Sequence, residues 1–79
     1  MYFAKDEIIT LNDDKKYLVL DTTVLDDDVY YKIKEVNNDE TETIGEEIYI
    51  TTLNQEGRIY INDKLSLEEI EKVKENFES

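Results

Sequence analysis

The chain has 79 residues, enough for one domain, and its 21 acidic residues against 9 basic ones give a net charge of −12. It contains neither cysteine nor histidine, which excludes disulfides, zinc sites of the usual Cys/His type and Ser-His-Asp or Cys-His catalysis. No apolar run has the length of a transmembrane helix or resembles a signal-peptide core. We therefore expect a single cytoplasmic domain over residues 1–79 that binds no membrane.

The first half of the chain predicts three strands joined by tight turns. Short β-branched or alternating runs cover Glu7–Leu11, Tyr17–Leu25 and Val29–Val36. The second run is apolar on both sides, with Val19 and Leu25 on one face and Leu20 and Val24 on the other, which favours a central strand. The third run alternates cleanly, and the face that we expect to meet water holds Tyr30, Lys32 and Lys34.

The second half predicts two more strands and a helix. We expect the polar stretch Asn37–Gly45 to be the longest and most mobile loop, followed by strands over Glu47–Leu53 and Arg58–Asn62. Ser66 and Glu69 form a capping box that starts the helix. The apolar stripe expected to pack on the sheet consists of Leu67, Ile70, Val73 and Phe77.

These elements predict an α+β fold that is mostly β. Consecutive strands with short turns give a five-stranded antiparallel meander, twisted and able to curl into a barrel-like sheet, closed by one C-terminal helix. The chain has no proline and only two glycines, so no linker or second domain is indicated.

No group of residues predicts catalysis, a bound metal or a cofactor. A calcium loop starting at Asp26 would need glycine at its sixth position, which is instead Tyr31 in a predicted strand. We interpret the acidic run at Asp26 as a solvated hairpin turn. Gly45 and Gly57 are isolated and neither opens a helix, so a phosphate-binding loop is not indicated.

Two surfaces are candidates for binding. We expect Tyr30 and Tyr60 to face outward, with Lys32 beside Tyr30, and exposed tyrosine is favoured at protein interfaces. Cross-strand packing within the sheet is the alternative. The candidate acidic surface consists of Asp26, Asp27, Asp28, Asp39, Glu40, Glu42, Glu46 and Glu47. Such charge repels nucleic acid and anionic membranes and attracts basic partners, although solubility alone would also explain it.

Two segments of the chain carry a resemblance to a known group of proteins. Residues Glu7–Leu20, followed by the Tyr-Tyr strand from Asp28 to Ile33, resemble short acidic proteins of unknown function from Gram-positive bacteria. In those proteins, strands separated by turns precede an acidic segment and a short helix. The resemblance implies the same β-meander with a C-terminal helix, and it carries over no activity and no site residue.

The sequence therefore favours a non-enzymatic module that binds another protein through a sheet face or an exposed strand edge, with a homodimer left open. The alternative is an acidic nucleic-acid mimic, of the kind made by phages or mobile elements, that inhibits a DNA- or RNA-binding protein. Acids laid out in two rows along one face would favour the mimic. Acids spread around an exposed aromatic patch would favour the interaction module.

Overall fold

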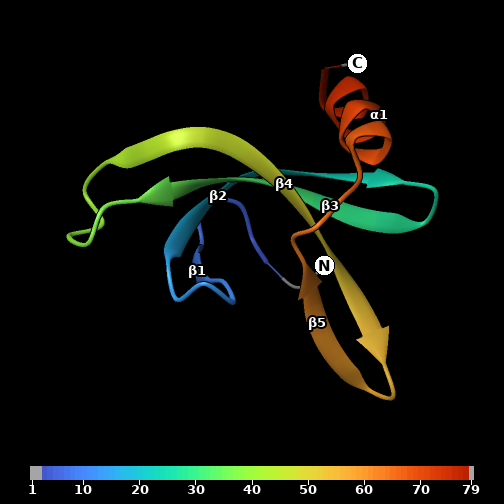
Figure 1. Cartoon of the computed structure of the whole chain (residues 1–79), viewed down its shortest axis with the longest axis horizontal. Helices are drawn as coiled ribbons and strands as arrows, with labels where there is room; N and C mark the ends of the chain where they lie inside the picture. The colour runs from blue at the N-terminus through green and yellow to red at the C-terminus, as the bar shows by residue number, and fades with distance from the viewer. Residues whose placement is uncertain (1–2, 79) are drawn as a thin grey trace.

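The structure of this chain is a computed structural model that describes residues 3–78. Its elements are β1 (Ile8–Thr10), β2 (Lys16–Leu25), β3 (Asp28–Val36), β4 (Thr43–Gln55), β5 (Arg58–Asn62) and α1 (Leu67–Glu78). The five strands pair antiparallel in chain order, which confirms the predicted meander with one C-terminal helix. The sheet curls into half a barrel, with β1 and β5 as its edge strands (Figure 1).

One face of the sheet, here called the inner face, carries the main hydrophobic core. The buried residues of this core are Ile9, Leu11, Tyr17, Val19, Tyr31, Ile33 and Ile50. The ring of Phe3 packs edge-on against that of Tyr31, with ring centroids 5.1 Å apart. The N-terminal segment therefore covers part of the core that the curled sheet leaves open.

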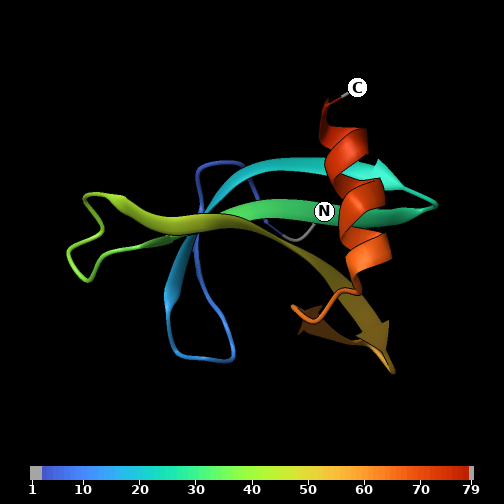
Figure 2. The same ribbon diagram turned by 45° about the horizontal axis from the view of Figure 1, so that its top comes forward.

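The opposite face, here called the outer face, is covered at the β2–β3 end by α1 (Figure 2). Val73 is fully buried in this contact. Nδ2 of Asn76 donates to Oγ1 of Thr23 at 2.6 Å and to the carbonyl oxygen of Val24 at 3.0 Å. This part of β2 lies beyond its pairing with β1, so the helix also occupies an otherwise open sheet edge.

The helix begins where the sequence predicts, but its apolar stripe is shorter. Oγ of Ser66 accepts a hydrogen bond from the backbone N–H of Glu69 at 3.1 Å, as expected for the N-cap. Leu67, however, is 82% exposed, so its predicted packing on the sheet is wrong. At about 100° per residue, Leu67 lies about 120° around the helix from Val73, the residue that faces the sheet most directly.

A bulge in β2 changes which of its residues share a face. The register with β3 shifts between Val19 and Asp21, which makes Leu20 the extra residue. Beyond this point the alternation is inverted, so Leu25 lies on the outer face and not on the face of Val19. Val24 is left 60% exposed on the inner side, and the predicted face assignment is wrong for this half of the strand.

The loop between β3 and β4 is shorter than predicted, and side-chain hydrogen bonds connect its two ends. β4 already begins at Thr43, so the loop ends at residue 42. Oδ1 of Asn37 accepts hydrogen bonds from the backbone N–H groups of Thr41 at 2.8 Å and Glu42 at 3.3 Å. Nδ2 of Asn37 donates to Oγ1 of Thr41 at 2.9 Å. A single asparagine side chain therefore connects the start of this loop to its end.

Candidate functional site

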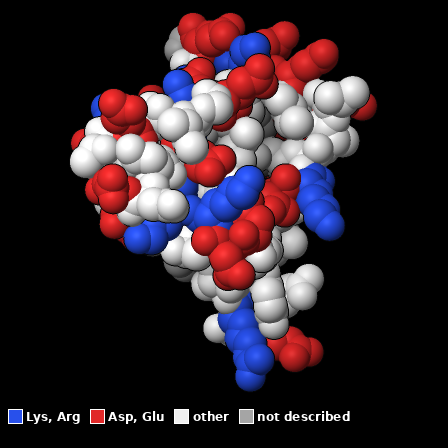
Figure 3. Space-filling model, turned by 60° about the vertical axis from the view of Figure 1, so that its left-hand side comes forward, with Lys and Arg blue, Asp and Glu red and all other residues white. Residues whose placement is uncertain are grey.

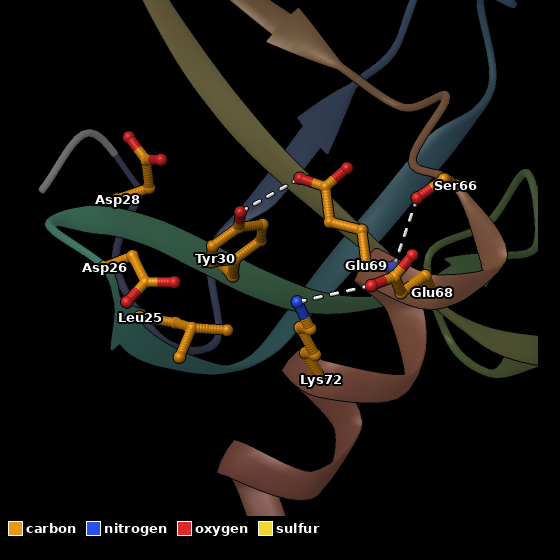
Figure 4. A pocket seen from close by; sticks show the side chains of 8 residues that line it. All are labelled: Leu25, Asp26, Asp28, Tyr30, Ser66, Glu68, Glu69 and Lys72. Carbon is orange, nitrogen blue, oxygen red and sulfur yellow. Dashed lines mark hydrogen bonds and ion pairs between the residues drawn. The ribbon is translucent and has the colours of Figure 1, made fainter.

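Tyr30, a predicted protein-binding residue, is buried and forms no exposed patch. It is 6% exposed, and its hydroxyl donates to Oε2 of Glu69 on α1 at 3.0 Å (Figure 4). Burial, followed by this hydrogen bond, raises the pKa of Tyr30 to about 12. The expectation that this face meets water fails here because alternation along β3 cannot reveal that α1 covers the polar side.

Lys32, predicted to stand beside an exposed Tyr30, also contacts the helix. Its Nζ lies 4.9 Å from the centroid of the Phe77 ring, a cation–π contact. The same ring lies 5.7 Å from that of Tyr49 on β4. Tyr30 and Lys32 therefore join the sheet to α1, and the structure does not bring them together with Tyr60 as one surface.

The predicted acidic residues are exposed but lie in two separate groups. Asp26, Asp27 and Asp28 occupy the β2–β3 turn, and the other five lie in or after the β3–β4 loop. The nine residues of β3 separate the β2–β3 turn from the β3–β4 loop by about 30 Å, and Glu46 and Glu47 lie on β4 between Ile44 and Ile48, the partners of Glu35 and Ile33. Basic side chains also stand among the acids on the face drawn in Figure 3, and Nζ of Lys16 binds Oε2 of Glu40 at 3.2 Å. These eight acids therefore form neither two rows along one face nor a ring around an aromatic patch.

A shallow pocket lies where α1 begins, against the β2–β3 turn (Figure 4). Its lining residues are Leu25, Asp26, Asp28, Tyr30, Ser66, Glu68, Glu69 and Lys72. Two of its carboxylates are already engaged, that of Glu69 by Tyr30 and that of Glu68 by Lys72 at 3.5 Å. Within residues 3–78, no group of three or more acidic side chains is placed to hold a metal ion. The pocket is therefore the hollow left where α1 packs against the β2–β3 turn.

The β4–β5 hairpin brings three exposed apolar residues close together, whereas the exposed apolar residues of the other elements, such as Val24 and Leu67, lie apart in the chain. It extends away from α1 (Figure 1). Tyr60 is 47% exposed, as predicted, and its cross-strand neighbour Leu53 is 43% exposed on the same face. Ile59, on the inner face, is 39% exposed. The turn residues Glu56 and Gly57 both have positive φ, 53° and 80°, typical of the two-residue turn that matches strand twist.

The outer edge of β5 has unpaired backbone groups at two positions. A two-residue turn places Gln55 and Arg58, which flank it, in a hydrogen-bonded pair. Pairs alternate along an antiparallel ladder, so Tyr60 also directs its N–H and C=O toward β4. Ile59 and Ile61 consequently direct theirs away from the sheet. No other strand in the described part of the chain pairs with this side of β5.

The other sheet edges in residues 3–78 are short, covered or charged. β1 has only three residues, and Asn76 occupies the open part of β2. The part of β4 that β5 does not reach carries Glu46 and Glu47, next to Gly45 with φ +77° and a register shift. Charges and bulges of this kind discourage pairing with another chain. β5 has no acidic residue and no bulge, and its one charge is at its first position. We call the side of β5 that faces away from β4, together with the side chains of Leu53, Ile59 and Tyr60, the β5 edge.

Sequence reasoning identified Tyr60 but missed Leu53 and Ile59. Both lie within the predicted strands Glu47–Leu53 and Arg58–Asn62. Neither residue is covered, because the hairpin extends past the elements that pack on the rest of the sheet. The available signal was the turn at Glu56 and Gly57, which fixes how far both strands continue.

No helix within residues 3–78 combines the length and apolar character needed to cross a bilayer. Comparison of the chain with protein families, with curated proteins and with solved structures found no match.

Proposed function

We propose that this protein is a non-enzymatic interaction module that accepts an extended strand of a partner protein along the β5 edge. The observation that supports this function is the free backbone at Ile59 and Ile61, flanked on both faces by exposed apolar side chains. Strand addition of this kind draws affinity from main-chain hydrogen bonds and specificity from alternate side chains. Both contributions are available at this edge.

The edge is preorganised, which lowers the entropy cost of binding. β5 is held by five cross-strand pairs to β4, so its free N–H and C=O groups have fixed positions. Each hydrogen bond gained by a partner contributes about 0.5–1.5 kcal/mol, and burial of Tyr60 and Leu53 adds about 25 cal/mol per Å². An unprotected apolar edge is also an aggregation hazard, which the net charge of −12 offsets.

The alternative function, a nucleic-acid mimic, is not carried forward. A mimic needs its carboxylates spaced along one continuous face in place of phosphates. The β2–β3 turn and the β3–β4 loop, which carry most of the candidate acids, lie at opposite ends of β3, and Lys16 binds Glu40 in the loop. Their arrangement favours a role in solubility and in repelling unwanted anionic partners.

The test is affinity capture from cells that produce the protein, with paired variants at one position. Ile59→Pro removes the outward N–H while leaving the pairing of β5 with β4 intact, since proline is tolerated on an edge strand. Ile59→Val keeps that N–H and the branched side chain and is the matched control. A third bait, carrying Asp39→Asn and Glu42→Gln, reduces the acidic charge of the β3–β4 loop.

We expect a partner that binds the wild-type chain and the Ile59→Val and acid-reduced baits, resists about 1 M salt, and is lost with Ile59→Pro. Thermal unfolding of each bait checks that all are folded. A partner captured equally by Ile59→Pro would overturn the assignment to the β5 edge. A nucleic-acid-binding partner lost only with the acid-reduced bait and with salt would favour the mimic instead.

A further inference from the structure

We infer that the strand accepted by the β5 edge is β5 of a second copy of this chain, paired antiparallel about a two-fold axis through Tyr60. This inference rests on the proposed function, because it fills the same edge. It follows from the register of the free backbone groups, the side chains beside them and the local charge. The product is a continuous sheet of ten strands, five from each copy.

The free backbone groups of β5 complement themselves. A two-fold axis at Tyr60 places Ile59 opposite the partner's Ile61, and Ile61 opposite the partner's Ile59. These are the two positions whose N–H and C=O point away from β4. All four groups on each copy are therefore paired within the strands, as an isologous interface requires. An axis at Ile59 or at Ile61 would extend the pairing beyond β5, into its turn or into the loop before α1.

The side chains match in the same register. Tyr60 faces the partner's Tyr60 across a non-hydrogen-bonded pair, in which side chains approach most closely. Leu53 lies behind Tyr60 on β4, so the outer face gains a four-residue apolar cluster at the axis. On the inner face, Ile59 packs against the partner's Ile61. Aromatic and β-branched cross-strand pairs are those that stabilise sheets best.

The local charge is complementary, although the whole chain is strongly acidic. Residues 55–64 carry two acids, Glu56 and Asp63, and two bases, Arg58 and Lys64, so the segment is neutral. In the two-fold register Glu56 approaches the partner's Lys64, and Arg58 approaches the partner's Asp63. Repulsion between the copies arises from acids elsewhere in the chain. Salt screens such long-range repulsion, so association should strengthen as salt is added.

The first test is sedimentation equilibrium of the full chain from about 5 µM to about 500 µM, at low salt and at about 0.3 M salt. The high protein concentrations are needed because an interface made by one short strand from each copy is small, and small interfaces are typically weak and transient. We expect the mass to rise from 9.4 kDa toward twice that value, and more readily at the higher salt. Ile59→Pro should weaken association at least about tenfold, whereas Ile59→Val should change it about threefold or less.

The second test reports the register directly. Cα atoms of a non-hydrogen-bonded pair lie about 4.5 Å apart, within the range that a disulfide spans. The chain contains no cysteine, so Tyr60→Cys introduces a single thiol. We expect this variant to form a disulfide-linked dimer with oxidised glutathione at least about tenfold faster than Leu67→Cys. Position 67 is 82% exposed but lies on α1, outside the paired strands.

A chain that stays monomeric throughout, with no excess cross-linking at position 60, would overturn the self-pairing. A dimer that Ile59→Pro leaves intact and that cross-links equally through position 67 would overturn it as well, since another surface would then be used. Neither result touches the proposed function, which fails only if a captured partner ignores Ile59→Pro. A monomer that still captures a partner through the β5 edge would refute self-pairing alone.

Discussion

The contrast between two apolar helix residues tests how α1 closes the sheet. Sequence periodicity places Leu67 and Val73 on one stripe, whereas the structure buries Val73 completely and leaves Leu67 82% exposed. Replacing each residue by alanine keeps the helix propensity high and removes only side-chain packing. The two substitutions should therefore have very different effects on the free energy of unfolding.

The expected magnitudes follow from burial. Val73→Ala deletes the equivalent of two buried methylene groups, about 0.8 kcal/mol each, and leaves a cavity under the helix, for a total of about 2–3 kcal/mol. Leu67→Ala removes a side chain that is mostly in water, so its effect should stay within about 0.5 kcal/mol. With a total stability of about 4–12 kcal/mol for a domain of this size, the first change is a large fraction.

The assay is urea unfolding followed by far-ultraviolet circular dichroism, at about 5 µM protein so that self-association does not contribute. For an m-value of about 1–1.5 kcal/mol/M, Val73→Ala should lower the midpoint by roughly 2 M and Leu67→Ala by less than about 0.5 M. Equal shifts, or a larger one for Leu67→Ala, would refute the inference that α1 docks through the turn around Val73.

Four further outcomes are expected. Asn37→Ala should cost about 1–3 kcal/mol and speed amide exchange at Thr41, because its side chain holds the β3–β4 loop; unchanged exchange would contradict that role. Asp27→Gly should raise the free energy of unfolding by about 0.5–1 kcal/mol in the same urea assay, since Asp27 has φ +69° in a tight turn. Burial and a hydrogen-bonded carboxylate raise the pKa of Tyr30, and likewise that of Tyr17, to about 12, above the ordinary tyrosine pKa of about 10, so the folded state binds more protons and stability falls as the pH rises from about 10 to 12. Tyr30→Phe should therefore unfold at higher pH in a tyrosinate absorbance titration, and an unchanged midpoint would exclude this linkage. Salt added up to about 0.3 M should raise the thermal midpoint at low protein concentration because the net charge is −12; a lower midpoint would mean that ion pairs outweigh the net repulsion.

Local signals in the sequence determined the elements of this fold. Ser66 caps the helix one residue before it starts, and β5 occupies the predicted range Arg58–Asn62. Both depend on short-range chemistry, namely a hydroxyl within reach of a free N–H and alternation between two turns. The meander order follows as well, because short turns leave consecutive strands no other antiparallel partner nearby.

Tertiary structure decided which side of each element is covered. Alternation along β3 separates Tyr30 and Lys32 from the core residues, but it cannot show that a helix more than thirty residues later packs over that polar face. The bulge at Leu20 similarly depends on a partner strand, and it moves Leu25 to the opposite face. The candidate site has the same origin: Tyr60 was identifiable from its strand, whereas the β5 edge exists because α1 covers β2 and reaches no further. Periodicity is a property of one segment, while exposure is a property of everything packed around it.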